Sequence, residues 1–335
     1  MPIRLSRRHA LTLTAASCAA PALLRAQTDP WDRVRARAAG LDQLRSILVM
    51  QDGEERLAVA LRGPGLDTPV NVKSVSKTIV AAVLGAAIDR EVVPSVTARL
   101  DAVAPDLIPA GAAEGVGAIT LEDLVTMRAG LERTSGPNYG AWVASANWVA
   151  DALGRPFVAE PGGRMLYSTG SFHVLGAALA RASGRSLLQM VRDWIGTPLD
   201  IQVPPWTQDP QGFYLGGNQM ALSPRGMAQF GELYRRDGEI GGTRVLSAEW
   251  VSRSFRQVTR SRWSGLGYGY GWFLGQVGGD DYALARGYGG QIICVCPARG
   301  MTVAITSDPD RPARSAGYFG DLQAMIENDI LPRAA

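Results

Sequence analysis

The chain has 335 residues, of which 46% are hydrophobic and 19% are charged, and its formal net charge is +3. Its length and apolar content are typical of one large or two closely packed globular domains with a substantial core. The small net charge gives no sign of a nucleic acid or an anionic membrane as a partner. After residue 26, no apolar run is long enough to span a bilayer.

Residues 1–26 have the pattern of an export signal: a basic start, a modest apolar run, and a Leu-Arg-Ala sequence before Gln27. Ser6-Arg7-Arg8-His9 resembles a twin-arginine signal. An uncleaved N-terminal helix is the alternative interpretation. We expect a periplasmic or secreted protein whose mature chain, residues 27–335, has 30 basic and 31 acidic side chains because four arginines leave with the signal.

The first elements after this segment are predicted to be a helix and a hairpin. Residues 31–43 look helical. Residues 45–51 and 55–61 are strand-like, and the Asp-Gly pair between them is a good hairpin signal. Ser74 then opens a helix over about residues 75–90, whose alanines and aliphatic side chains leave little polar surface. We expect this helix to be buried in the centre of the fold.

The middle of the chain is predicted to be helical, and its end returns to strands. Strand-like patterns lie at residues 266–275, 282–286, 291–297 and 301–306, followed by a final helix at about 316–330. This order predicts an α+β fold, in which one antiparallel sheet built from both termini is flanked by helices and carries an inserted, mostly helical region. The α/β part covers about residues 27–100 and 236–335, and the helical part about 101–235. A cleft is expected at their junction, near the start of the buried helix.

The cysteines and the histidine beyond residue 26 are predicted to be structural. Cys294 and Cys296 alternate along one strand, where neighbouring thiols bond poorly, so we expect them to fill the core. His173 lies in an amphipathic helical pattern and is expected to be packed. One histidine and two cysteines exclude a multi-histidine or a four-cysteine zinc site, and we expect no cofactor.

The two lysines of the chain, Lys73 and Lys77, lie in one heptapeptide, whereas the other 32 basic side chains are arginines. Arginine does not lose its proton in a protein, but a buried lysine can. Lys77 follows Ser74 by three residues, which places both side chains on one face of a helix. A serine beside a lysine that can become neutral is an activated nucleophile.

Two further segments fit this pair in order and spacing: Pro161-Gly-Gly-Arg-Met-Leu-Tyr167-Ser168-Thr169-Gly170 and Arg286-Gly-Tyr288-Gly289-Gly290-Gln291. Together, the three segments resemble the serine β-lactamase and penicillin-binding superfamily. The likeness is greatest to its class C-like branch, which includes family VIII carboxylesterases and 6-aminohexanoate-dimer hydrolases. The resemblance covers nearly the whole mature chain, and the joint pattern is specific although each segment alone is weak.

The resemblance implies a role for each matching residue. Ser74 would be the acylated nucleophile, Lys77 its base or proton relay, and Tyr167 a second base whose pKa is lowered by the adjacent positive charge of Lys77. The backbone N–H groups of Ser74 and Gln291 would form the oxyanion hole. Glycines 289 and 290 would let the strand approach the substrate closely.

Tyr288, Gly289, Gly290, Asn218 and Tyr139 are the expected substrate-binding residues. Asn218 follows two glycines and is equally consistent with a surface turn, and Tyr139 with ordinary packing. Outside this set, Lys73 is expected to be structural and to pair with a carboxylate near the cleft.

Two departures from the family pattern affect the expected substrate. Thr169 replaces an asparagine, which removes an amide contact, and Tyr288 replaces the lysine that in β-lactamases and D,D-peptidases helps to hold the substrate carboxylate. Arg286 shares the strand face of Tyr288, where replacement of this charge is one interpretation, but we expect it to face solvent. We therefore expect an exported serine hydrolase of a small ester or amide. The alternatives are a β-lactamase or D,D-peptidase on the same scaffold and an inactive sensor or binding domain.

Overall fold

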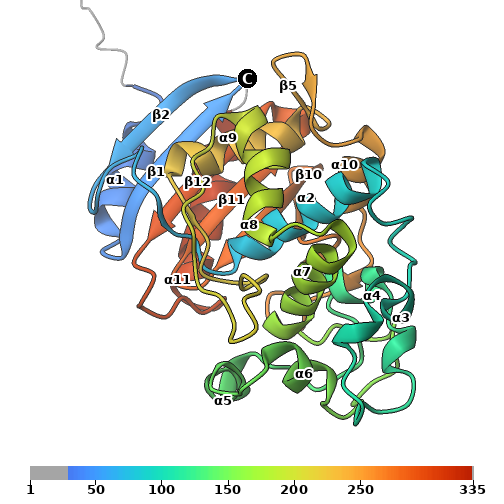
Figure 1. Cartoon of the computed structure of the whole chain (residues 1–335). Helices are drawn as coiled ribbons and strands as arrows, with labels where there is room; N and C mark the ends of the chain where they lie inside the picture. The colour runs from blue at the N-terminus through green and yellow to red at the C-terminus, as the bar shows by residue number, and fades with distance from the viewer. Residues whose placement is uncertain (1–28, 334–335) are drawn as a thin grey trace, which may run out of the picture.

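The computed structural model describes residues 29–333, so the predicted export signal lies outside the described residues. Within this range, eight strands form one antiparallel sheet in the order β2-β1-β12-β11-β10-β9-β8-β7. The strands of this sheet are β1 (Leu44–Gln51), β2 (Glu54–Ala60), β7 (Thr259–Arg260), β8 (Gly267–Tyr268), β9 (Phe273–Val277), β10 (Asp280–Gly287), β11 (Gln291–Cys296) and β12 (Met301–Ser307). β1 pairs with β12, so strands from the two ends of the chain lie side by side, near the β2 edge of the sheet (Figure 1).

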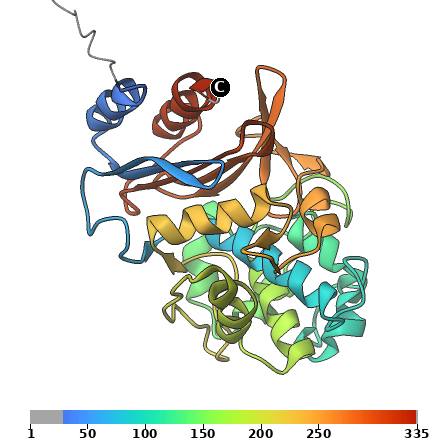
Figure 2. The ribbon, with the colours of Figure 1, turned by 90° about the horizontal axis from the view of Figure 1, so that it is seen from above.

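Helices cover both faces of the sheet, as the sequence predicts. Figure 2 shows α1 (Asp32–Gly40) and α11 (Tyr318–Met325) on one face, and α2 (Val75–Asp89) and α9 (Pro224–Arg235) on the other. All six residues of β11 are buried between these layers. Cys294 and Cys296 are therefore core thiols and are not joined in a disulfide. No helix between residues 29 and 333 is long and apolar enough to cross a membrane.

The inserted region contains short helices and long loops, and it lies beside α2 (Figure 1). Its helices are α3 (Leu100–Val103), α4 (Leu121–Val125), α5 (Tyr139–Val143), α6 (Trp148–Leu153), α7 (Thr169–Ser183) and α8 (Leu187–Met190). The helix α9, which falls in the range predicted for this region, packs instead against β11 and β12. A small hairpin of β5 (Glu239–Ile240) and β6 (Thr243–Arg244) follows α9 and precedes α10 (Ala248–Ser254).

The helix α2 lies between the sheet and the inserted region, in contact with both β10 and α7. Its residues 75–87 are buried, because alanine and aliphatic side chains can pack on every side of the helix. Ser74 occupies the N-cap position. The start of the helix is thereby held at the junction where the sequence predicts a cleft.

A two-stranded sheet fixes the chain just before Ser74. β3 (Val70–Asn71) pairs with β4 (Ala221–Leu222), and the N–H of Val72 donates to the Met220 carbonyl over 2.9 Å. Strands of two residues are too short to show the alternation of apolar and polar side chains by which a strand is recognised from sequence. This pairing ties the start of α2 to the loop that contains Asn218.

Gly85 of α2 is predicted to be required for the position of this helix. A Cβ atom at Gly85 would lie 2.5 Å from atoms of the Trp250 ring, and overpacking of this kind typically costs about 1–3 kcal/mol. We expect Gly85→Ala to lower the free energy of unfolding by about this amount in urea denaturation. Gly140→Ala, where no atom lies within 4 Å of the new Cβ, is the matched control and should not destabilise the protein. Equal stability of the two variants would contradict the packing argument.

Candidate active site

Ser74 and Lys77 meet at the first turn of α2. The Nζ atom of Lys77 lies 3.0 Å from the Oγ atom of Ser74, in hydrogen-bond geometry. The side chains are three positions apart, which on a helix brings them to one face. The predicted pair is therefore in contact, and it lies at the junction of the sheet and the inserted region.

Lys77 has two further hydrogen-bond partners, from separate segments. Its Nζ atom donates to the carbonyl oxygen of Gly217 over 2.6 Å and to the hydroxyl of Thr169 over 3.2 Å. None of the three partners carries a formal charge, and only 2% of the Lys77 residue is exposed. Burial therefore lowers the pKa of Lys77 from 10.5 to about 7.

These partners fit a neutral amine as well as an ammonium. A neutral amine has two N–H donors and one lone pair. With the donors directed to Gly217 and Thr169, the lone pair faces the Ser74 hydroxyl. Thr169 is itself held by Ser135, whose Oγ atom lies 3.0 Å from the threonine hydroxyl oxygen and accepts from the Thr169 N–H over 2.8 Å.

Tyr167 lies beside Ser74, just before α7, and its electrostatic environment differs from the prediction. Burial raises the pKa of Tyr167, while a hydrogen bond with Ser74 and the charge of Arg286 partly oppose this rise. Lys77 lies over the tyrosine ring, with its Nζ atom 5.0 Å from the ring centroid. The prediction that Lys77 lowers the pKa of Tyr167 is therefore wrong: the opposing cation is Arg286, and the net shift is upward.

A cavity of about 310 Å³ opens beside Ser74 and Tyr167. Tyr288 and Arg286 both line this cavity. Arg286 was predicted to face solvent, but its guanidinium stacks on Phe319 instead. The remaining predicted residues, Gly289, Gly290, Gln291, Asn218 and Tyr139, are outside its lining.

The hairpin between β10 and β11 explains why Gln291 lies outside the cavity. Gln291 is fully buried and pairs with Gly287, and its side chain donates to the Ser307 carbonyl over 2.9 Å. The β10 side of the turn, by contrast, comes close to the start of α2: a Cβ at Gly287 would lie 2.3 Å from the Val72 carbonyl oxygen. Tyr288 follows directly, and its backbone N–H has no acceptor within the described range. We therefore replace Gln291 by Tyr288 as the candidate second donor.

Gly289 and Gly290 face away from the cavity. Both have positive φ angles, of 81° and 99°. A Cβ at Gly289 would lie 2.2 Å from the Asp308 carbonyl oxygen, so this glycine is needed for packing of the turn on the chain after β12.

Asn218 and Tyr139 contact each other, since the Asn218 side-chain amide donates to the Tyr139 hydroxyl over 3.0 Å. Lys73 forms an ion pair with Asp310 at 3.6 Å, in agreement with its predicted structural role.

A buried histidine and aspartate lie behind the loop that binds Lys77. The Nε2 atom of His173 is 3.0 Å from Asp209, and both side chains are fully buried. The N–H of Gly216 donates to the Nδ1 atom of His173 over 3.4 Å, which assigns the ring proton to Nε2. His173 is packed, as predicted, but the sequence did not reveal that it holds the glycine next to Gly217.

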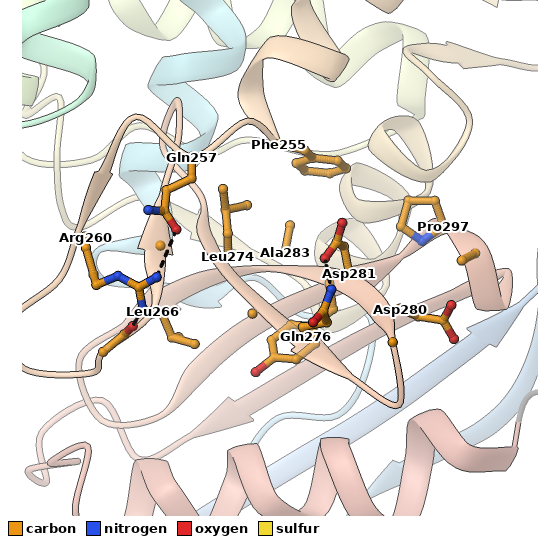
Figure 3. Close-up of a pocket in the computed structure, with 16 residues that line it drawn as sticks. Phe255, Gln257, Arg260, Leu266, Leu274, Gln276, Asp280, Asp281, Ala283 and Pro297 are labelled. Atoms are coloured by element: carbon orange, nitrogen blue, oxygen red, sulfur yellow. Dashed lines mark hydrogen bonds between the residues drawn. The ribbon is translucent and has the colours of Figure 1, made fainter.

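A larger cavity of about 860 Å³ lies at another part of the sheet (Figure 3). It is lined by residues of the β7 to β10 strands and contains Arg260 and Asp281, but neither Ser74, Lys77 nor Tyr167. Polar groups there bond to each other, as in the 3.0 Å contact between Gln276 and Asp281. Among residues 29–333, no three His, Cys, Asp or Glu side chains are grouped to hold a metal ion.

Solved structures of several hydrolases share this fold at low sequence identity. EstCE1, described as a hydrolase with promiscuous acyltransferase activity, matches with a TM-score of 0.75 and 18% identity over 90% of this chain and 98% of its own. A Bacillus anthracis protein named as a 6-aminohexanoate-dimer hydrolase matches with a TM-score of 0.72 and 17% identity, over 87% of this chain and 79% of its own. A D-stereospecific amidohydrolase from Streptomyces sp. matches with a TM-score of 0.69 and 17% identity, over 87% of this chain and 96% of its own.

No curated protein gives a significant match to the sequence. The profile of the Beta-lactamase family, however, matches residues 45–324, which include all the segments that form the Ser74 site. The match extends over most of the chain and agrees with the antiparallel sheet and the flanking helices described above. The chain therefore belongs to the Beta-lactamase family of hydrolases.

Proposed function

We propose that the chain is an exported serine hydrolase that cleaves a small ester or amide through an acyl-enzyme on Ser74. The observation that carries this proposal is the 3.0 Å contact between Ser74 and Lys77, in a buried site that lowers the pKa of the amine to about 7. An amine with this pKa is about half neutral near pH 7 and can accept the serine proton. Export is supported by the sequence of residues 1–26 alone.

Lys77 is the base of the acylation step. Its lone pair takes the Ser74 proton while the Oγ atom attacks the carbonyl carbon of the substrate. Negative charge then develops on the carbonyl oxygen, and the backbone N–H groups of Ser74 and Tyr288 donate to it. Neither N–H has an acceptor among residues 29–333, and the N-terminal end of α2 adds a favourable dipole.

Tyr167 supplies the proton that the leaving group needs. Because burial raises the pKa of Tyr167 above its ordinary value, the tyrosine is protonated at neutral pH, which leaves it as a donor and Lys77 as the base. The tyrosine protonates the leaving atom as the bond to the carbonyl carbon breaks, and it regains a proton from Lys77. Water then attacks the acyl-enzyme, and the carboxylic acid product leaves as Ser74 is restored.

β-Lactam cleavage is the second candidate, because the chain belongs to the Beta-lactamase family. The uncharged Tyr288 at the position of the family lysine weakens this candidate, and hydrolysis of a chromogenic cephalosporin tests it. An inactive sensor domain is the third candidate. Reaction of Ser74 with a fluorophosphonate probe would exclude that candidate.

Substitution of each lysine tests the role of the amine. Ser74→Ala should abolish hydrolysis of p-nitrophenyl esters, and Lys77→Arg should lower kcat/KM by at least about a hundredfold because the arginine cannot act as a base. Lys73→Arg is the matched control: it keeps a positive charge near Asp310, and it should retain the activity of the parent protein. Unchanged hydrolysis by Ser74→Ala would rule out the acyl-enzyme.

The pH dependence of kcat/KM distinguishes the two candidate bases. The folded-state pKa of Lys77 is lowered to about 7, so the ammonium form predominates below this pH and cannot accept a proton. We expect kcat/KM to rise with pH through a midpoint near 7 and then to level off. A rate that rises only in alkaline solution, where a tyrosine ionises, would instead identify Tyr167 as the base.

Substitution of Thr169 tests whether the hydrogen-bond partners of Lys77 set the pH midpoint of kcat/KM. The threonine hydroxyl accepts from Lys77 over 3.2 Å, and such bonds are stronger when the donor is charged. Thr169→Val removes the acceptor and should move the acidic midpoint of kcat/KM to lower pH. Thr169→Ser keeps the hydroxyl and should leave the midpoint unchanged. An equal midpoint in both variants would contradict this assignment.

A further inference from the structure

We infer that His173 is a positioning residue of the Ser74 site: Asp209 fixes its ring proton on Nε2, and its Nδ1 atom holds the loop that binds Lys77. This inference rests on the proposed function, because Lys77 is the base of that reaction. Neither His173 nor Asp209 lines the cavity beside Ser74, so both act through other residues.

Asp209 has three hydrogen-bond partners. Its Oδ1 atom accepts from the N–H groups of Gln211 and Phe213 over 2.9 and 2.8 Å, and its Oδ2 atom lies 3.0 Å from Nε2 of His173. Both side chains of the pair are fully buried, where an unpaired polar group is costly. The carboxylate therefore keeps the ring proton of His173 on Nε2 and leaves a lone pair on Nδ1.

The ring of His173 is held in this orientation by two aromatic neighbours. The ring centroids of Trp142 in α5 and Trp148 in α6 lie 5.7 and 5.6 Å from that of His173. The Nε1–H of Trp142 donates to the Trp148 carbonyl over 2.8 Å, so the two indoles are themselves fixed. A rotation that exchanged the two ring nitrogens would break both polar contacts of the imidazole in a buried site, which is costly.

The helix α7 provides two of the contacts that position Lys77. Thr169 and His173 are four positions apart on this helix and therefore share one face. Thr169 accepts directly from Lys77, over 3.2 Å. His173 acts one step further away: its Nδ1 atom accepts from the Gly216 N–H over 3.4 Å, and the carbonyl of the next residue, Gly217, accepts from Lys77 over 2.6 Å.

The two glycines make this loop dependent on contacts with its surroundings. Glycine has the widest range of backbone conformations, so a Gly-Gly segment does not fix the direction of its own carbonyl groups. A side chain cannot stiffen the loop, since a Cβ at Gly216 would lie 2.1 Å from a backbone oxygen of α7. After Gly217, the Met220 N–H donates to the Ser76 hydroxyl over 3.1 Å. His173 supplies the corresponding anchor before Gly217.

Two amide substitutions separate the roles of the two ring nitrogens. In His173→Asn, the side-chain oxygen takes the position of Nδ1 and can accept from Gly216. In His173→Gln, the side-chain N–H takes the position of Nε2 and can donate to Asp209, but the acceptor for Gly216 is lost. Both variants replace a neutral ring by a neutral amide and remove one hydrogen bond, so each is the control for the other.

We expect His173→Gln to lose activity and His173→Asn to retain it. Displacement of a catalytic group by about 1 Å can cost about a hundredfold in rate. In the full chain, His173→Gln should lower kcat/KM for p-nitrophenyl acetate at least about tenfold, and His173→Asn should stay within about threefold of the parent. If His173→Asn is no more active than His173→Gln, the Nδ1 anchor is not what the site requires, and the inference is overturned.

Carbon-13 labelling of lysine measures the same effect without a substrate. The chain has two lysines, so Lys73→Arg leaves the side-chain signal of Lys77 alone. The Gly217 carbonyl stabilises the ammonium form, because hydrogen bonds are stronger when the donor is charged. In this background, His173→Gln should move the titration midpoint of the Lys77 Cε signal to lower pH, and His173→Asn should leave it unchanged. A midpoint in His173→Gln at or above that of the parent would overturn the inference.

The tautomer of the histidine is a test that needs no change at His173. The other histidine of the chain is His9, so His9→Gln leaves a single imidazole. Nitrogen-15 NMR in neutral solution should show a protonated Nε2 atom and an unprotonated Nδ1 atom. A protonated Nδ1 atom would oppose the Gly216 N–H and would contradict the inference, even if both His173 variants fail to fold.

These measurements separate the inference from the proposed function. If the parent chain hydrolyses no ester, the hydrolase proposal fails, but a lower Lys77 midpoint in His173→Gln would still support the positioning role. If Ser74→Ala abolishes hydrolysis while the two His173 variants have equal kcat/KM and equal Lys77 midpoints, the inference fails and the hydrolase proposal stands.

Discussion

The amine of Lys77 is buried 3.0 Å from the Ser74 hydroxyl, and its removal from water lowers its pKa from 10.5 to about 7. This environment requires a helix that is buried from its first turn, because an exposed first turn would leave the lysine solvated and charged. The apolar sequence of α2 meets this requirement. The sheet on one side and the inserted helices on the other complete the burial.

Three distant segments of the chain meet at this amine, and each is anchored separately. The first turn of α2 is tied down by β3 and β4, and the start of α7 brings Thr169. The loop that presents the Gly217 carbonyl is held by the buried pair of His173 and Asp209. The amine is therefore positioned by neutral oxygen atoms that rigid elements hold in place. A carboxylate at this position would instead stabilise the ammonium form and raise the pKa.

The sequence was sufficient where the relevant interactions are local or periodic. The contact of Ser74 with Lys77 follows from helical spacing, and the sheet follows from strand patterns at both ends of the chain. The sequence was not sufficient to predict the position of the Arg286 side chain, because its stacking partner Phe319 lies in a helix more than thirty residues later in the chain. The sequence also pointed to Gln291 rather than Tyr288 as the second donor, because the position of a hairpin turn, which decides which backbone groups face the cavity, could not be read from it.

The restriction of lysine to one heptapeptide has a practical consequence for chemical modification. Reagents that acylate primary amines do not react with the 32 arginines. Only 2% of the Lys77 residue and 15% of the Lys73 side chain are exposed. Attachment of a dye or a solid support through amines would therefore be confined to the α-amino group and Lys73. Amine reagents therefore have two sites at most, and modification of Lys73 reports directly on the access of reagents to the start of α2.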